Sequence, residues 1–376
     1  MKFAHEYRDK ALAWSTAEVI GRRVDPARDY TLMEFCGGHT HAICRYGIVD
    51  LLPENVRLVH GPGCPVCVLP IGRVDQAIAL AEQPNVILAT FGDMMRVPGS
   101  DRKTLLSAKA SGADIRIIYS VLDALELARK NPARQVIFFA IGFESTAPAT
   151  ALAVQMAARE GLRNFFVFCT HVTTPAAIDG IFATNAARSG QVKVDGVIGP
   201  GHVASITGSD YYKDVAARHR LPMVVSGFEP LDLLQSVLML IDQIRDGRAE
   251  VETQYARAVT VGGNARAQAM MRDVFVTRES FDWRGFGELP GSALRLAPAY
   301  ARYDAEAVFG IGYHRVTDNP ACSCIEILGG VKQPLDCRLF GKACTPENPI
   351  GACMVSPEGT CSAYWQHARH HAGETA

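Results

Sequence analysis

The sequence predicts an α/β protein with two similar parallel-sheet domains, followed by a small loop-rich domain at the C-terminus. Short apolar runs alternate with stretches of helical i, i+3, i+4 apolar spacing, which is the pattern of βαβ units. A Gly-Pro-Gly turn follows a Val-rich run in each half, at 61–63 and at 199–201. From about residue 281 the apolar periodicity weakens, and Gly, Pro and Cys become more frequent.

The first sheet domain is expected at 29–130, after an N-terminal helical segment at 1–28. Residues 121–128 carry the apolar spacing of a helix. Four apolar runs are the predicted strands, and the first three lead into turns that contain glycine: 31–35, 56–60, 86–90 and 115–119.

The second sheet domain is expected at 131–280, because Asn131-Pro132 marks a plausible boundary. A long amphipathic helix is predicted over 231–244. The remaining residues, 281–376, form the third domain, which we expect to be held together by a metal rather than by a large core. The predicted strands of the second domain are 136–141, 165–168, 196–198 and 223–225.

Composition and charge exclude several classes of protein. The chain has 376 residues and a net charge of −1, so no broad attraction to nucleic acid or to anionic membranes is expected. The first ten residues are charged and lack the apolar stretch of a secretory signal. No apolar run reaches the roughly 18 residues that a membrane span needs. We therefore expect a cytoplasmic protein with no nucleic-acid or membrane partner, whose clustered cysteines serve metal or redox chemistry rather than disulfides.

The first candidate site is Cys36-Gly-Gly-His39-Thr-His41, at the carboxyl end of the first predicted strand. Ligands of open α/β sheets bind at such ends, and the two glycines leave backbone N–H groups free to approach one. A thiol and two imidazoles lie within six residues. A strand-to-helix turn with one buried cysteine explains the motif about equally well, and zinc is a weaker alternative.

The second candidate site is Cys64-Pro-Val-Cys67, which follows the second predicted strand. A Cys-x-x-Cys pair at the start of a helix is the thioredoxin-like placement, where the helix N-terminus stabilises a thiolate. Such a pair cycles between dithiol and disulfide or binds a soft metal. If both turns belong to one sheet, Cys36, Cys64 and Cys67 meet at one edge of it.

The third candidate site is the C-terminal tail, where six of the 11 cysteines lie in the last 55 residues. Only one short pair is present, whereas zinc sites usually contain paired Cys-x₂₋₄-Cys units. The irregular spacing favours a [4Fe–4S] cluster over zinc, with two thiols left for a redox dithiol. These cysteines are Cys322, Cys324, Cys337, Cys344, Cys353 and Cys361.

Three weaker candidates lie at the ends of predicted strands. His202 belongs to a Gly-x-Gly-x-x-Ala match to the dinucleotide fingerprint, which a proline in the turn makes poor. Glu144 and Glu229 each follow Gly-Phe, and they are either polar site residues or simple helix starts.

Across nearly its whole length the sequence resembles the HypD family of [NiFe]-hydrogenase maturation factors. The matching segments occur in the family's order: EFCGGHTH at 34–41, HGPGCPVC at 60–67, FGDMMRVPG at 91–99, IGFESTAP at 141–148, IGPGHV at 198–203, SGFEP at 226–230 and CMVSPEGTC at 353–361.

The resemblance implies a scaffold on which the Fe(CN)₂CO unit of [NiFe]-hydrogenase is assembled, in complex with HypC and with cyanide from HypE, which HypF charges. It implies that Cys36 binds this iron together with a cysteine of HypC, and that Cys64 and Cys67 form the nearby dithiol or further iron ligands. It also implies a [4Fe–4S] cluster in surroundings similar to those of ferredoxin:thioredoxin reductase. The implied cluster ligands are Cys322, Cys337, Cys344 and Cys353, and the implied spare pair is Cys324 and Cys361.

The residues themselves agree with that chemistry. Iron that carries CO and cyanide prefers soft thiolates. Cyanide nitrogens need hydrogen-bond donors, which glycine backbones, His39 and His41 offer. Two alternatives remain at this stage. One is a stand-alone disulfide oxidoreductase resembling ferredoxin:thioredoxin reductase, and the other is a structural zinc protein with an α/β binding module. Whether the protein is an enzyme or an assembly platform stays open.

Overall fold

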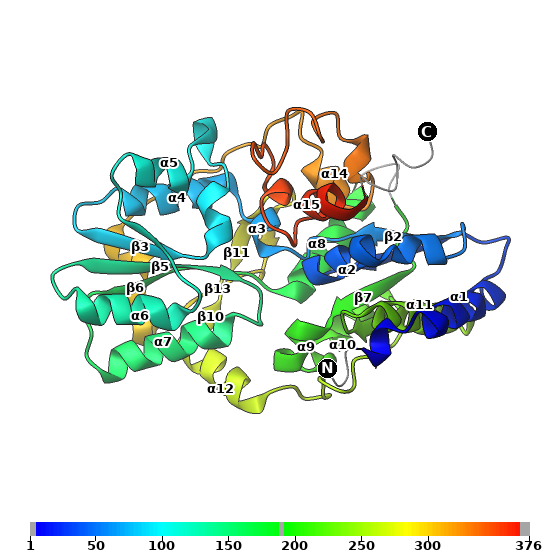
Figure 1. Cartoon of the computed structure of the whole chain (residues 1–376). Coiled ribbons are helices and arrows are strands. Elements are labelled where there is room, and N and C mark those ends of the chain that lie inside the picture. The colour runs from blue at the N-terminus through cyan, green and yellow to red at the C-terminus, as the bar shows by residue number, and fades with distance from the viewer. Residues whose placement is uncertain (1–4, 188–191, 369–376) are drawn as a thin grey trace.

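The computed structural model describes residues 5–187 and 192–368. Two lobes lie side by side, each built on a parallel sheet, and the end of the chain, drawn in orange and red, lies at the top near the middle (Figure 1). The predicted α/β class with two parallel sheets and a loop-rich, cysteine-containing C-terminal region is confirmed. Within the described ranges, no helix combines the length and hydrophobicity required to cross a lipid bilayer.

The first sheet, sheet A, has five parallel strands in the order β2-β1-β7-β8-β9. Its strands are β1 (Tyr30–Glu34), β2 (Val56–His60), β7 (Gly196–Pro200), β8 (Met223–Ser226) and β9 (Val251–Thr253). The second, sheet B, has four parallel strands in the order β4-β3-β5-β6. Its strands are β3 (Val86–Thr90), β4 (Ile115–Ile117), β5 (Gln135–Gly142) and β6 (Phe165–His171).

The strands do not divide between the sheets in the expected order. The chain begins in sheet A, crosses to sheet B for β3 to β6, and returns to sheet A with β7. The boundary expected at Asn131 falls inside one sheet, because β4 and β5 on either side of it both belong to sheet B. Strands buried on both faces are uniformly apolar, so their sequences do not specify which strand lies beside which.

Fifteen α-helices connect and cover the sheets within the described ranges. They are α1 (Lys10–Arg23), α2 (Gly37–Tyr46), α3 (Pro65–Val68), α4 (Ile71–Ala81), α5 (Leu105–Ala110), α6 (Val121–Lys130), α7 (Ala147–Arg159), α8 (Thr174–Ala187), α9 (Gly201–Thr207), α10 (Lys213–His219), α11 (Pro230–Arg245), α12 (Ala265–Val274), α13 (Ala305–Phe309), α14 (Cys324–Leu328) and α15 (Thr360–Ala363).

Helix α11 shows how local sequence defines an element. Pro230 occupies the first turn, where its missing N–H costs nothing, and the Glu229 and Asp232 side chains cap the free N–H groups. Its buried residues recur with helical spacing and cover sheet A: Leu233, Leu234, Val237, Leu240 and Ile241. The helix predicted over 231–244 is therefore confirmed.

The C-terminal region begins with two short antiparallel strand pairs and then has little regular structure. The outer pair joins β10 (Phe275–Thr277) to β13 (Leu294–Leu296), and the hairpin between them joins β11 (Ser280–Trp283) to β12 (Gly287–Pro290). One hydrophobic core runs from sheet A through sheet B into this region, and it contains Met33, Ile137 and Met354. The cysteine-rich segment thus packs against both sheets.

Candidate functional site

The Cys36 turn and the Cys64 turn touch. Strands β1 and β2 pair in parallel with Glu34 opposite His60, so the chain leaves both strands at the same edge of sheet A. The Gly37 N–H donates to the Gly63 carbonyl at 3.4 Å. A Cβ added to Gly63 would lie 2.3 Å from the backbone nitrogen of Cys36, so only glycine fits this contact. The prediction that both turns come from one sheet is confirmed.

Glu34, the last residue of β1, holds the turn between β1 and α2 that contains Cys36. The sequence analysis did not select it as a site residue. Its carboxylate is 1% exposed and accepts the Cys36 N–H at 2.7 Å. It also accepts the Thr40 hydroxyl and lies 2.8 Å from His60 Nδ1. Glu34 could have been selected from the sequence because it is a charged residue at the end of an otherwise apolar strand.

The Cys36 thiol is buried beside an imidazole. Its Sγ lies 3.5 Å from His202 Nδ1. Burial raises the pKa of Cys36 well above its usual value, and the negative charges of Glu358 and Glu34 raise it further. Burial lowers the pKa of His202 to about 4, so this imidazole is neutral at pH 7 and has a nitrogen free to accept a proton. The weak fingerprint residue His202 is thus brought to the first motif.

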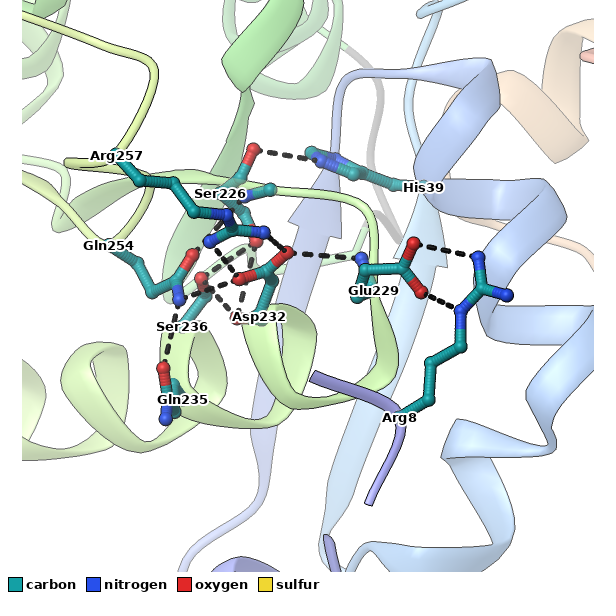
Figure 2. Close-up of polar contacts among 10 residues, drawn as sticks. Arg8, His39, Ser226, Glu229, Asp232, Gln235, Ser236, Gln254 and Arg257 are labelled. Carbon is teal, nitrogen blue, oxygen red and sulfur yellow. Dashed lines mark hydrogen bonds and ion pairs between the residues drawn. The ribbon is translucent and has the colours of Figure 1, made fainter. Parts of the chain in front are cut away.

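The two histidines of the first motif point to different places. His39 is fully buried, and its Nε2 lies 3.3 Å from the Ser226 carbonyl (Figure 2). Its ring packs on Phe228, with the ring centroids 4.9 Å apart. His41 is only partly buried and meets the His367 ring edge-on at 4.8 Å. The motif therefore divides into one histidine against sheet A and one on the outer face of α2.

A cavity of about 360 Å³ opens beside His202, between the two lobes. One wall is the Cys64 turn, through Gly63, Pro65 and Val66. The polar groups that line the cavity come from both sheets and from the tail: Asp93, Ser145, Thr146, His202, Ser356 and Glu358. The tail itself closes on the Cys36 turn, since a Cβ on Gly37 would lie 2.3 Å from the Glu358 carbonyl oxygen.

Cys64 and Cys67 lie at the start of α3. The Cys64 Sγ caps this helix by accepting the Cys67 N–H at 3.4 Å. Cys67 is completely buried, and burial raises its pKa well above the usual value. Its thiol has two sulfur neighbours within hydrogen-bonding reach, Cys353 and Cys64. The second candidate site therefore contacts the third directly.

The six tail cysteines group differently from the expected ligand set and spare pair. Five of them line one small apolar cavity: Cys322, Cys324, Cys337, Cys344 and Cys361. Cys353 instead lies between Cys324 and Cys67, and hydrogen bonds from these two thiols lower its pKa to about 6. Cys324 is the centre of the group, with its Sγ 3.2 Å from that of Cys322 and within reach of Cys361.

These thiols have the donor chemistry that a thiolate-bound cluster needs. Five cysteines line one apolar cavity, and this donor set is compatible with a [4Fe–4S] group, whose irons are held by cysteine thiolates. Across the described ranges, no three metal-binding side chains already stand together as the ligands of one metal ion. Cluster binding would thus require thiol side chains to turn toward the cavity.

Glu144 and Glu229 are both engaged in structural contacts. Glu144, 1% exposed, accepts the Thr174 N–H at 2.7 Å and the Tyr211 hydroxyl at 2.8 Å, which links the two lobes. Glu229 forms an ion pair with Arg8 of the N-terminal segment (Figure 2). Glu229 is the N-cap residue of α11, whereas Glu144 binds the first residue of α8 and Tyr211 rather than the start of its own helix. Their role as polar site residues stays a prediction.

A buried network holds the loop that carries Phe228. Asp232 is 0% exposed and binds Arg257 through two hydrogen bonds of 2.7 and 2.6 Å. It also accepts the backbone N–H of Glu229 at 3.1 Å (Figure 2). Phe228, between Ser226 and Glu229, contacts the rings of His39 and His202. This network therefore supports the surroundings of Cys36 from outside the motifs.

Comparisons with known proteins agree with this arrangement. A family model described as "HypD: Hydrogenase formation hypA family" matches residues 11–368. A hydrogenase maturation factor HypD of Rhizobium leguminosarum bv. viciae is 58% identical, covering 98% of this chain and 96% of the relative. The same-named factor of Azotobacter vinelandii is 57% identical over 98% and 97%, and that of Escherichia coli (strain K12) is 45% identical over 98% of both. The chain therefore belongs to the HypD family of hydrogenase maturation factors.

Proposed function

We propose that this protein is a scaffold and redox factor for assembling the Fe(CN)₂CO unit of [NiFe]-hydrogenase. The observation that carries the proposal is the meeting of the Cys36 thiol, the neutral His202 imidazole and the Cys64 turn beside one cavity. The iron unit is the cargo of this site. Assembly of the iron unit depends on reduced thiols, so we propose that it takes place in the cytoplasm.

Cys36 is the proposed protein ligand of the cargo iron. Because burial and nearby carboxylates raise its pKa, the thiol is protonated until iron arrives, and iron binding would release this proton. The neutral His202 at 3.5 Å is positioned to hold the thiol by a hydrogen bond. A second thiolate would come from a cysteine of HypC, and cyanide from HypE. The Ser145 hydroxyl, which lines the cavity, is a candidate donor to a cyanide nitrogen.

The [4Fe–4S] cluster is proposed to sit in the apolar cavity of the tail. The ligand set Cys322, Cys337, Cys344 and Cys353 is one hypothesis. The grouping of thiols favours Cys361 in place of Cys353, because Cys361 lines the cavity whereas Cys353 contacts Cys67. When bound, the cluster would supply single electrons to neighbouring thiols.

The remaining thiols form a proposed relay from the tail to the iron site. Cys324 contacts Cys353, Cys353 contacts Cys67, and Cys67 contacts Cys64. Thiol–disulfide exchange requires a thiolate next to an acceptor sulfur, and the low pKa of Cys353 provides one. Two reducing equivalents could thereby pass from the tail to the Cys64–Cys67 pair beside Cys36.

The test is the Cys36→Ala variant, produced without oxygen together with HypC. We expect the wild-type complex to show infrared bands of bound cyanide and CO, and the variant to lose these bands and hydrogenase maturation while keeping iron and sulfide in the tail. Cys44→Ala is a matched control, since Cys44 is also a buried thiol of the same turn-and-helix segment. Normal maturation by Cys36→Ala would remove the proposed ligand role.

A second candidate function is a stand-alone disulfide oxidoreductase. The contact between Cys67 and Cys353 favours it, because it joins a Cys-x-x-Cys pair to the tail thiols. Turnover of a disulfide substrate without HypC would support this alternative. A disulfide oxidoreductase would not need the arrangement of Cys36 and His202, so we rank this function second.

A further inference from the structure

Two adjoining cavities reach the tail thiols, and neither is lined by Cys36, Cys64 or Cys67. Their volumes are about 320 and 460 Å³, and both are lined by Arg284, residues 316–319 and Cys322. The first also reaches Cys324. All eleven cysteines lie in the described ranges, and Cys322 alone among them is partly exposed. The relay thus has a solvent-connected end at Cys322 and Cys324.

A nearly buried arginine with an unused donor lies in the shared wall. Arg284 is 4% exposed, and its Nε donates to the Leu69 carbonyl at 2.8 Å and lies 3.6 Å from Asp318 Oδ1. Among the described atoms its Nη2 has no hydrogen-bond partner, and neither has the buried Nε1 of Trp283, a lining residue of the second cavity. Unsatisfied buried donors are uncommon in folded proteins, and a ligand is one explanation of such groups.

The lip of the first cavity is built from a backbone turn in an uncommon conformation. Asp101 and Arg102 both have left-handed φ angles, of +53° and +62°, which costs free energy for residues other than glycine. Arg102 is exposed, and its guanidinium donates to the side chain of Asn348 in the tail. Positive and negative groups therefore face this cavity together, Arg102 and Arg284 with Asp101 and Asp318.

We propose that this cavity binds a low-molecular-weight thiol with both carboxylate and amino groups, and that it delivers the sulfur of this thiol to Cys324. The volumes match a small-molecule site of roughly 300–1,000 Å³ rather than a protein interface. The arginines suit carboxylates, and the aspartates suit an ammonium group. The inference rests on the proposed function, because it takes Cys324 and Cys353 as the dithiol of the relay.

The reaction balances as two exchanges. The thiolate of the ligand attacks Sγ of Cys324 in a Cys324–Cys353 disulfide, and Cys353 leaves as a thiolate. A second ligand thiolate attacks the ligand sulfur of this mixed disulfide and releases Cys324. Two ligand thiols are oxidised to one ligand disulfide and the protein disulfide is reduced. Of the two protons that the ligand thiols give up, one ends on Cys324 and one in solvent, because Cys353 leaves as a thiolate.

The test uses the full chain, purified anaerobically with its metal, after mild oxidation by diamide. Reduction by glutathione is compared with reduction by the neutral thiol 2-mercaptoethanol, and mass spectrometry after alkylation follows Cys324 and Cys353. With rates corrected for the thiolate fraction, we expect glutathione to be about tenfold faster, with a transient glutathione adduct on Cys324. Equal rates, or a first adduct on another cysteine, would overturn the inference.

Two variants and two controls separate binding from folding. Arg102→Ala removes one carboxylate partner and should reduce the preference for glutathione about fivefold, while Asp318→Asn should weaken it through the amino group. Asn348→Ala removes the hydrogen bond from Arg102 but keeps the charge of Arg102, so the preference should persist. Arg266→Ala, an exposed arginine on α12, should change nothing.

The outcomes distinguish this inference from the proposed function. If the infrared bands of cyanide and CO appear but glutathione and 2-mercaptoethanol react at equal rates, the thiol-binding site is refuted and the iron scaffold is not. If glutathione is preferred but the protein never shows those bands, the iron scaffold is refuted and the thiol-binding site is not.

Discussion

Gly63→Ala is the sharpest perturbation of the contact between the two cysteine turns. The added Cβ would lie 2.3 Å from Cys36 N, 2.4 Å from Phe35 C and 2.5 Å from Cys36 Cα. Ordinary contact begins near 3.4 Å, so backbone must move by about 1 Å. Overpacking of this kind costs about 1–3 kcal/mol of unfolding free energy. A displacement of about 1 Å at a reacting group can also cost roughly 100-fold in rate.

The assay is hydrogenase maturation in cells that lack their own factor, with urea unfolding of the purified variant. Gly262→Ala is a neutral control, since no atom lies within 4 Å of its added Cβ. Gly72→Ala is a destabilising control, because its Cβ would lie 2.0 Å from the His314 carbonyl oxygen, away from Cys36. We expect Gly63→Ala to lose maturation even at temperatures where Gly72→Ala retains it. Wild-type maturation and stability in Gly63→Ala would refute the contact.

Three further predictions concern charge. Burial raises the pKa of Cys36 most and the Glu358 carboxylate raises it further, so Glu358→Gln should speed iodoacetamide labelling of Cys36 at pH 7.5; an unchanged rate would contradict this. Asp232→Ala leaves the mostly buried Arg257 unpaired and should cost about 3 kcal/mol in urea unfolding, whereas the double variant with Arg257→Ala should recover part of it. Burial lowers the pKa of His171 to about 4, below its unfolded value of about 6.5. The unfolded chain therefore binds the proton first, and stability should fall as pH drops from about 6.5 to 4, by up to about 1.4 kcal/mol per unit, less steeply in His171→Gln.

Local structure was predictable because it depends on local sequence. The run 31–35 became β1 at Tyr30–Glu34, and the run 56–60 became β2 over the same residues. The pairing of sheets was not predictable, because β1 takes β7, about 160 residues later, as its second neighbour. Uniformly apolar parallel strands leave the choice of neighbour to the packing of crossover helices.

The site was predictable where a motif follows a strand. Cys36 and Cys64 lie at the ends of neighbouring strands, so their meeting follows from the strand pattern. Glu34 and Phe228 act through packing and hydrogen bonds that no spacing rule encodes. The grouping of tail thiols was equally hidden, because the loops that bring Cys353 to Cys67 have no periodicity.

The position of Cys353 connects the two halves of the proposed chemistry. It is completely buried, yet hydrogen bonds from Cys324 and Cys67 stabilise its thiolate and lower its pKa to about 6. A buried thiolate with one sulfur neighbour on each side can exchange with either and is shielded from solvent oxidants. If the proposed function holds, the reductant reacts at Cys324 and the iron binds at Cys36. The two therefore act at separate places in the protein. Cys353→Ser should separate the two ends. Cys324 should still form a mixed disulfide when glutathione disulfide is supplied, with release of one glutathione thiol, whereas an oxidised Cys64–Cys67 pair should no longer be reduced from that side. Reduction of that pair at the wild-type rate in Cys353→Ser would mean that electrons reach Cys67 by another route.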